Sequence, residues 1–200
     1  MSRVLLPQGE LILEPDFIDS QSAQQLYQTL VNELHWQQPN IRMFGKQVSI
    51  PRLQCFQGEP GIRYRYSGLT LQTEPWHPCI NEIRQRIEAF SQQPFNSVLI
   101  NYYRNGQDSM GWHSDDEAEL GTNPVIASVS LGQVRRFLLR HRYDNTITRQ
   151  EHLLNNGSLL IMASQLQHYW HHSVPKTNRP LEGRINLTFR HTLNPDMQME

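Results

Sequence analysis

The carboxy-terminal half of the sequence consists of short β-rich segments separated by turn-forming residues. The segments are 97–103, 125–131, 136–142, 157–162 and 185–191. β-Branched and aromatic residues favour extended backbone, and several short strands in succession are typical of a β-sandwich or barrel. We therefore expect the second half of the chain to form such a β core.

Two amphipathic helices are expected before this β-rich half. Ser22 with Gln25 resembles a capping box, and apolar residues at helical spacing follow it, which predicts a helix over 22–35. A second helix is predicted over 77–90, with Pro78 in its first turn. Its expected apolar face consists of Ile80, Ile83, Ile87 and Phe90. This face should pack on a sheet.

The region 41–70 contains turn residues between short extended segments, and we expect its hairpins to lie outside the main barrel. At 200 residues the chain is long enough for one well-packed domain but hardly for two independent ones. We therefore predict one compact domain, with an amino-terminal extension of helices and hairpins over 1–94 and a β core over 95–200. The predicted fold class is mainly β with flanking helices.

The composition excludes several classes of protein. Hydrophobic residues make up 38% of the chain and charged residues 18%, and no apolar run reaches the length of about eighteen residues that a membrane span needs. The amino terminus lacks the long apolar core of a secretory signal, so we expect a soluble monomer in the cytoplasm, or in the nucleus of a eukaryote. Cys55 and Cys79 form no C-x-x-C pair, which favours reduced core thiols over a zinc knuckle or a disulfide.

The charge distribution limits how the chain can bind nucleic acid. The formal net charge of -1 argues against a generally basic surface, so any such binding must come from local clusters. One cluster lies between Arg42 and Arg65, where five basic residues accompany the single acid Glu59. The second cluster consists of Arg135, Arg136, Arg140 and Arg142.

A candidate metal site begins with His113 and Asp115. One residue separates them, so at the end of an extended strand both side chains point to the same side. Two imidazoles and one carboxylate form a facial triad that leaves iron positions open for a 2-oxo acid and for dioxygen. The candidates for the second imidazole are His168, His171 and His172. The alternative interpretation is that the His-x-Asp pair is a surface feature of a turn.

A candidate anion site lies near the carboxy terminus. The segment 184–190 alternates polar and apolar residues in the order Arg184, Ile185, Asn186, Leu187, Thr188, Phe189, Arg190. If the polar face lines the barrel interior, Arg184 and Arg190 suit the carboxylates of a diacid such as 2-oxoglutarate. Asn101 and Tyr103 are candidates for neutral hydrogen bonds to the same acid. The competing interpretations are an edge strand with solvated arginines and a purely core position for Tyr103.

Together these motifs resemble the AlkB family of Fe(II)- and 2-oxoglutarate-dependent dioxygenases. The matching segments are Asn101-Tyr102-Tyr103, His113-Ser114-Asp115-Asp116-Glu117, His172-Ser173-Val174-Pro175 and 184–190. Their order and their spacing both match, and the resemblance extends from about residue 41 to residue 193. It looks closest to members that act on DNA and that carry an extra nucleotide-recognition hairpin region before the barrel.

The resemblance implies a double-stranded β-helix, a relative of the jelly roll, with two sets of ligands inside it. The implied Fe2+ ligands, which are also the catalytic set, are His113, Asp115 and His172. The implied 2-oxoglutarate ligands are Asn101, Tyr103, Arg184, Asn186 and Arg190, with Arg190 at the carboxylate nearer the iron. The implied activity uses dioxygen to oxidise methyl or small alkyl groups on bases such as 1-methyladenine and 3-methylcytosine, with release of formaldehyde.

A further set of residues is expected to contact the alkylated nucleic acid, which is DNA or, as the open alternative, RNA. These residues are Met43, Phe44, Arg52, Tyr64, Tyr66, Ser67, Asp116 and Glu117. Met43 and Phe44 resemble an apolar wedge that fills the gap left by an extruded base, although they could pack back on the domain. The tyrosines resemble a base pocket but could be core residues. The two acids suit a cationic base, although they could be solvated.

Two other functions are compatible with parts of the pattern. An iron enzyme that hydroxylates a protein side chain or a small molecule would turn over without nucleic acid and would tolerate Phe44→Ala. A non-catalytic nucleic-acid-binding module would keep the fold and lose the chemistry. The complete set of two imidazoles, one carboxylate and two arginines argues against this second alternative.

Overall fold

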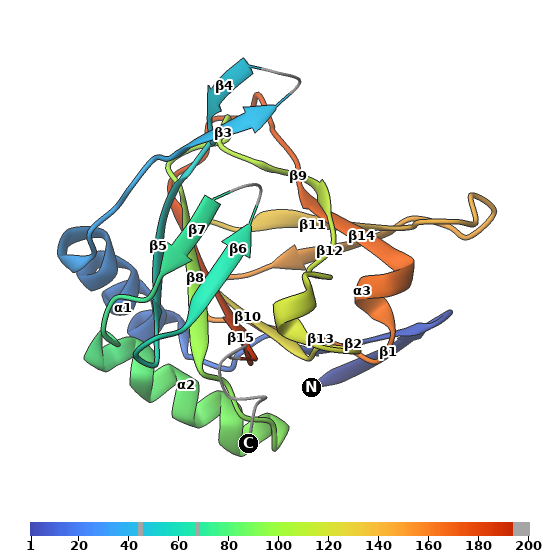
Figure 1. Cartoon of the computed structure of the whole chain (residues 1–200), viewed down its shortest axis with the longest axis horizontal. Helices are drawn as coiled ribbons and strands as arrows, with labels where there is room; N and C mark the ends of the chain where they lie inside the picture. Colours follow the sequence, from blue (N-terminus) through green and yellow to red (C-terminus); the bar gives the residue numbers. More distant parts are fainter. Residues whose placement is uncertain (44–45, 67–68, 194–200) are drawn as a thin grey trace.

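An antiparallel sheet of seven strands forms the largest layer of the computed structural model, which describes residues 1–43, 46–66 and 69–193 (Figure 1). In spatial order its strands are β1 (Ser2–Leu6), β2 (Gly9–Glu14), β13 (Leu159–Ala163), β10 (Ile126–Gly132), β15 (Arg184–Arg190), β8 (Ser97–Tyr103) and β5 (Leu53–Gly58). Strand β15 therefore lies in the interior of the sheet, between β10 and β8. The edge-strand interpretation of this segment is wrong.

A second antiparallel sheet of four strands packs against the first. Its strands, in spatial order, are β12 (Gln150–Leu154), β11 (Arg135–His141), β14 (Trp170–Val174) and β9 (Met110–His113). Apolar side chains from both sheets meet in one core cluster between them, including Leu99 and Leu160 from the large sheet and Phe137 and Trp170 from the small one. Two facing antiparallel sheets with this shared core form the predicted jelly-roll architecture.

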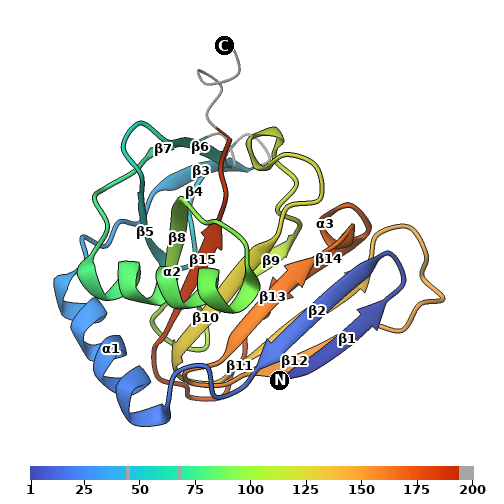
Figure 2. The same ribbon diagram turned by 90° about the horizontal axis from the view of Figure 1, so that it is seen from below.

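Two helices, α1 (Ser20–Glu33) and α2 (Pro78–Ser91), cover the outer face of the large sheet (Figure 2). A second apolar cluster joins them to the sheet, and it includes Leu30 and Ile83 from the helices and Leu187 from β15. Both helices were expected within two residues of these bounds. Two details were wrong. Asp19, not Ser22, caps α1 by accepting a hydrogen bond from the Ser22 amide at 2.9 Å. The Phe90 side chain is 37% exposed.

The region 41–70 contains two hairpins and one strand of the large sheet. Strand β3 (Asn40–Met43) pairs only with β4 (Lys46–Ser49), and β6 (Arg63–Tyr66) only with β7 (Leu69–Gln72), within the described residues. In Figure 1, β3 and β4 lie at the top of the molecule, and β7 lies beside β5. The two hairpins are thus separate from the main sheets, as expected, whereas β5, which lies between them in sequence, joins the large sheet.

The amino terminus also contributes to the core. Strands β1 and β2, which the sequence did not predict, form a hairpin that pairs with β13 through β2. The large sheet therefore crosses the expected boundary at residue 94, because three of its seven strands come from residues before it. The remaining short elements are a 3-10 turn, η1 (Ala118–Leu120), and α3 (Leu166–Tyr169), which connects β13 to β14.

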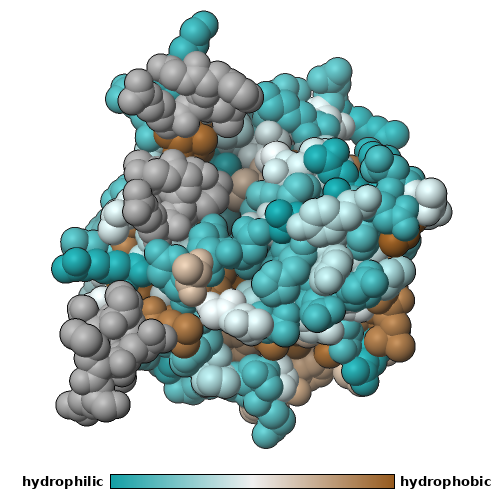
Figure 3. Space-filling view, turned by 45° about the vertical axis from the view of Figure 1, so that its right-hand side comes forward, coloured by the Kyte–Doolittle hydropathy of each residue, from teal (hydrophilic) through white to brown (hydrophobic). Residues whose placement is uncertain are grey.

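The outer surface is mainly polar. On the face drawn in Figure 3, hydrophilic side chains predominate and apolar ones form small, separate groups. Leu5 and Leu153 are among the large apolar residues that remain exposed. No helix within the described part of the chain is long and apolar enough to cross a membrane.

Candidate active site

The polar face of β15 lines the space between the two sheets. Its alternate residues, Ile185, Leu187 and Phe189, pack under the helices, so the side chains between them must point to the opposite face. Those inward side chains are all buried, with exposed fractions of 0% for Arg184, 9% for Asn186, 8% for Thr188 and 4% for Arg190. Buried arginines are rare unless they have a partner, so this face requires anionic or polar groups opposite it.

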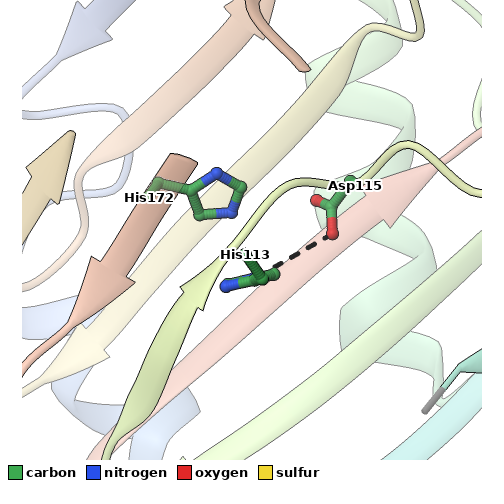
Figure 4. Close-up of side chains that lie close together, drawn as sticks. All are labelled: His113, Asp115 and His172. Atoms are coloured by element: carbon green, nitrogen blue, oxygen red, sulfur yellow. Dashed lines mark ion pairs between the residues drawn. The ribbon is translucent and has the colours of Figure 1, made fainter. Parts of the chain in front are cut away.

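His113, Asp115 and His172 meet at one end of this space. His113 is the last residue of β9, and it lies directly opposite His172 of β14 in the sheet register. Asp115 follows two residues later in a loop. One ligand atom from each of the three residues lies within 4.8 Å of the other two, and Figure 4 shows the three side chains pointing toward one another. Among the three histidines proposed for the last position, the structure brings His172 to this cluster.

The other two histidines lie elsewhere for a simple geometric reason. His171 precedes His172 on the same strand, so it points to the outer face of the small sheet. Its environment there includes Arg140 and Arg142. His168 is half-buried in α3.

The donor atoms of the cluster are free to bind a metal. His113 Nδ1 lies 2.9 Å from the Gly111 carbonyl oxygen, so the tautomer that donates this bond presents a lone pair at Nε2. Asp115 Oδ1 accepts a hydrogen bond from Arg190 Nη2 at 3.0 Å. Asp115 Oδ2 and His172 Nδ1 are buried and have no hydrogen-bond partner among the described residues. Buried polar atoms without partners are uncommon in native proteins, and a cation bound by this cluster would satisfy them.

The protonation states also suit a metal. Burial, with the neighbouring His113, lowers the pKa of His172 to about 3, and burial lowers the pKa of His113. Burial acts to raise the pKa of Asp115, but the Arg190 guanidinium and the two imidazoles outweigh it and lower that pKa to about 2. At neutral pH the cluster is therefore two neutral imidazoles and one carboxylate, which is the form that binds a divalent cation. A three-ligand set of this kind leaves coordination positions open, as non-haem iron chemistry requires.

The second part of the site surrounds Arg184. Its Nη2 donates to Ser130 Oγ at 2.8 Å, while Nε and Nη1 have no hydrogen-bond partner among the described residues. Burial lowers the pKa of Arg184 to about 10, so the side chain still carries its charge at neutral pH. No carboxylate in the described chain pairs with it. A guanidinium with two free donors in a closed space fits the carboxylate of a bound diacid.

Asn101 and Tyr103 lie opposite Asn186 and Arg184 on the neighbouring strand β8. Tyr103 is 1% exposed, and its ring centre lies 5.4 Å from the Arg184 guanidinium carbon, so it is both a core residue and a wall of the site. Arg52 Nε donates to Asn101 Oδ1 at 2.7 Å. Because this bond fixes the amide oxygen, the Asn101 NH2 group remains the end that can donate elsewhere.

A cavity of about 30 Å³ lies beside His113, Asp115 and His172 and reaches Asn101 and Tyr103, which flank Arg184. Its lining includes Asn101, Tyr103, Met110, His113, Asp115, Ser128, Met162, His172, Asn186 and Arg190. A larger cavity of about 550 Å³ lies elsewhere, between β11, β12 and the loop after β14. It contains none of the metal-cluster residues. We therefore assign the candidate active site to the smaller cavity.

The residues predicted to contact nucleic acid divide into four groups. Arg52 is 3% exposed and lies beneath Asn101, so it belongs to the interior of the site. Asp116 is exposed and pairs with Arg142 at 2.8 Å. Phe44 and Ser67 lie outside the described residues, and so do the side chains of Met43 and Tyr66.

Glu117 and Tyr64 form the fourth group, beside the candidate metal site. Tyr64 is fully buried, and the Arg190 guanidinium carbon lies 5.2 Å from its ring centre. Burial and the charge of Asp115 raise the pKa of the half-buried Glu117 carboxyl. This carboxyl therefore lies where a second negative charge is unfavourable unless a cation is bound nearby.

The second basic cluster is not one surface patch. Arg135 is buried and donates to three backbone carbonyl groups, those of Asn105, Asp108 and Pro175. Arg136 pairs with Glu151, and the Arg140 guanidinium carbon lies 4.5 Å from the centre of the Trp112 ring.

Two serines of the site were missed from the sequence. Ser130 Oγ accepts from Arg184, and Ser128 Oγ accepts from Asn186 Nδ2 at 2.9 Å. Both lie on β10, directly beside β15. The signal was present, because two serines at alternate positions in an otherwise apolar strand indicate a polar stripe on one face.

Comparisons with known proteins agree with this geometry. The sequence profile of the 2OG-Fe(II) oxygenase superfamily matches residues 10–190. The "DNA oxidative demethylase ALKBH2" of Bos taurus is 39% identical over 180 residues, covering 86% of this chain and 65% of the bovine protein. The human "Alpha-ketoglutarate-dependent dioxygenase alkB homolog 3" is 39% identical over 202 residues, covering 96% of this chain and 70% of that protein. The chain thus spans just under two thirds of the bovine relative.

A solved structure supports the fold assignment. "The structure of OsALKBH1" superposes with a TM-score of 0.65 at 16% sequence identity, covering 94% of this chain and 98% of that one. At this identity the likeness concerns the fold.

Proposed function

The chain belongs to the AlkB family within the 2OG-Fe(II) oxygenase superfamily, and on that premise we propose that it is a dioxygenase that removes alkyl groups from DNA bases. The proposed cofactor is Fe2+, bound by His113, Asp115 and His172, and the proposed cosubstrate is 2-oxoglutarate. The relatives named as DNA oxidative demethylases support the choice of DNA. RNA with the same lesions is the alternative substrate.

One observation carries this proposal. Three side chains that can bind a metal converge within 4.8 Å, and one of them, the buried Asp115, accepts a hydrogen bond from Arg190. A second buried guanidinium, that of Arg184, lies on the same strand and has two free donors. Together these groups can hold a metal ion and a diacid next to each other, as 2-oxoglutarate-dependent chemistry requires. A metal site alone would fit many hydrolytic enzymes.

The chemistry divides between the bound groups and the protein. When bound, iron and 2-oxoglutarate would supply an oxidant from dioxygen: 2-oxoglutarate loses CO2 and keeps one oxygen atom as succinate, and the other oxygen atom is inserted into a C–H bond of the N-alkyl group to give a hydroxyl. A hydroxylated N-methyl group then leaves as formaldehyde. Arg184, Asn101 and Tyr103 hold the distal carboxylate, and Arg190 stabilises the end nearer the metal. The buried walls of the cavity exclude water.

The environment of Glu117 supports a cationic base as substrate. A base methylated at N1 of adenine or N3 of cytosine carries a positive charge, and it would relieve the unfavourable second negative charge beside Asp115. Tyr64, buried next to this carboxyl, supplies an aromatic wall. Recognition of an extruded base by stacking and by a charged edge is typical of enzymes that modify bases.

The two hairpins, β3–β4 and β6–β7, are the proposed DNA-binding elements. Lys46 on β4 and Arg63 on β6 are exposed and can contact phosphates. We also propose that Phe44 acts as the wedge that replaces an extruded base in a duplex. Each candidate ligand set is complete within one chain, which supports action as a monomer in the compartment that holds the DNA.

The test is a direct repair assay. Iron-loaded protein is incubated with 2-oxoglutarate, dioxygen and matched oligonucleotides carrying 1-methyladenine or 3-methylcytosine, as single- and double-stranded DNA and RNA. Mass spectrometry measures the repaired base. The expected result is repair of DNA with formation of succinate. Succinate formation with a protein or small molecule but no repair of any oligonucleotide would refute the substrate class.

Matched variants separate the parts of the proposal. His172→Ala should abolish repair, whereas His171→Ala, on the opposite face of the same strand, should leave it unchanged. Phe44→Ala should lower repair of double-stranded substrates and spare single-stranded ones. Val48→Ala, an exposed position on the same hairpin, is the control. Equal losses on both substrates for Phe44→Ala would argue against the wedge.

A further inference from the structure

Gln167 is a fully buried polar side chain that the proposed chemistry does not use. It lies in α3, the short helix between β13 and β14, and its exposed fraction is 0%. Burying an amide costs free energy unless its hydrogen bonds are made. The partners of this side chain therefore indicate what it stabilises.

Those partners lie next to the metal cluster. Gln167 Oε1 accepts a hydrogen bond from the backbone N–H of Asp115 at 2.9 Å, and Nε2 lies 3.7 Å from the Met162 sulfur. Because a backbone N–H can only donate, the amide oxygen must face Asp115, and the weakly accepting thioether suits the NH2 end. The orientation of the amide group is thus fixed by its two neighbours.

The position of Asp115 in the chain makes this bond important. Strand β9 ends at His113, and residues 114–117 belong to no strand or helix. The Asp115 N–H therefore has no carbonyl group of a neighbouring strand to accept its hydrogen bond. The Gln167 side chain accepts that bond instead. On the side-chain end, Arg190 binds Oδ1. Asp115 is therefore fixed both at its backbone N–H and at its side-chain Oδ1. Its Oδ2 has no hydrogen-bond partner among the described residues.

The same loop is fixed from outside by Arg142. Its Nη1 contacts Ser114 Oγ at 3.3 Å, Asp116 Oδ2 at 2.8 Å and the backbone oxygen of Gln167 at 3.2 Å. Two side chains therefore join the loop to helix α3: Arg142 on the outer, half-exposed side and Gln167 on the inner, buried side. Of these two, only Gln167 binds the backbone of Asp115.

We propose that Gln167 is a positioning residue for Asp115, which fixes the backbone so that the carboxylate presents Oδ2 to the metal. The inference rests on the proposed metal role of Asp115. Groups that orient metal ligands typically change metal affinity by about 10- to 100-fold when they are removed. We expect a loss of that size when the acceptor of Gln167 is removed.

Cobalt(II) binding, followed by visible absorption, tests the proposal without turnover. Gln167→Leu keeps the size of the side chain and removes the acceptor, so it should weaken cobalt binding about 10- to 100-fold and alter the spectrum. Gln167→Glu keeps an acceptor oxygen at the same reach and should recover most of the affinity. Gln165→Leu, an exposed position two residues earlier, should match the parent protein.

Hydrogen exchange at the Asp115 amide, measured by NMR on metal-free protein, gives an independent readout. The amide should be protected in the parent and in Gln167→Glu, and it should exchange faster in Gln167→Leu while strands β8 and β15 stay protected. If Gln167→Leu does not fold, Gln167→Asn, whose acceptor is one methylene shorter, replaces it with the same expected direction.

The outcomes separate this inference from the proposed function. If the parent and Asp115→Ala bind cobalt equally, the metal role of Asp115 is wrong. If the parent binds through Asp115 but Gln167→Leu binds equally well with an unchanged spectrum, the positioning role is overturned. The positioning role is also overturned if Gln167→Glu binds cobalt as weakly as Gln167→Leu, because the acceptor oxygen would then not be the decisive group.

Discussion

Arg190 Nη2 donates to Asp115 Oδ1 at 3.0 Å, and the two side chains are only 5% and 4% exposed. This pair joins the proposed metal site to the proposed cosubstrate site. Burial disfavours the charge on Arg190, but Asp115 outweighs that effect and raises the Arg190 pKa. The buried Asp115 carboxylate depends on the Arg190 guanidinium, just as a bound ligand would. The pair therefore contributes to the stability of the fold as well as to function.

Removing Arg190 should destabilise the metal-free protein. Arg190→Met leaves Asp115 as a buried carboxylate without its partner, and breaking a buried pair in this way typically costs about 3 to 5 kcal/mol. Urea denaturation of the metal-free protein measures the free energy of unfolding. Arg136→Met removes the exposed pair with Glu151 and should produce no measurable change. Equal stability of Arg190→Met and the parent would contradict the prediction.

The same pair predicts a pH dependence. The pKa of Asp115 is lowered from 3.8 to about 2 in the folded protein, so the pair stabilises the fold above the ordinary carboxyl pKa. This contribution is lost as the pH falls toward 2. The difference in unfolding free energy between the parent and Arg190→Met should therefore narrow as the pH falls from 3.8, the ordinary carboxyl pKa, toward 2. A difference that widens on acidification would refute this assignment.

Arg184 should control the affinity for 2-oxoglutarate. Truncating one partner of a buried charge pair typically costs about 2 to 5 kcal/mol, so Arg184→Met should weaken binding by roughly 30-fold or more. Arg184→Lys should recover little, because an ammonium lacks the planar pair of donors. Calorimetry with metal-loaded protein measures the affinity directly. Arg179→Met, which removes an exposed arginine that lines the large cavity and not the proposed site, is the matched control.

Gly157 should tolerate no side chain. Its φ is +81°, and a Cβ atom would lie 2.0 Å from the Ile18 carbonyl oxygen. Gly61 has nearly the same φ, +84°, with nothing within 4 Å of such an atom. Gly61→Ala should therefore lower the free energy of unfolding only by the cost of a positive φ, about 1 to 2 kcal/mol. Gly157→Ala should lower it clearly more, because of the collision with Ile18. Thermal unfolding compares the two variants, and equal losses would show that the collision is relieved.

Cys55 should be unreactive in the folded protein. Burial, and then the neighbouring Glu74, raises its pKa to about 12, so the thiol stays protonated at pH 8. Iodoacetamide followed by mass spectrometry should label Cys55 at pH 8 only after unfolding. Burial also raises the pKa of the half-buried Cys79. Rapid labelling of Cys55 in native protein would show that β5 opens readily.

The sequence predicted strands well where both faces of a strand have a clear character. Segment 97–103 corresponds to β8 residue for residue, and 185–191 corresponds to β15 with a shift of one residue. The strands that were missed, β1, β2, β12 and β14, are short or mix polar and apolar residues on both faces. Such segments become strands because a neighbouring strand receives their hydrogen bonds, and a linear pattern does not contain that neighbour.

The amino-acid sequence alone determined that a β core exists, that two amphipathic helices lie in the first half of the chain, and which residue types could bind a metal and a diacid. These features depend on local spacing, because alternation and helical periodicity act over a few residues. Only the tertiary structure decided that β15 is an inner strand, that His172 and not His171 faces His113, and that Gln167 reaches Asp115. These relationships depend on sheet register and on contacts between residues far apart in sequence, where a shift of one residue reverses the direction of every side chain.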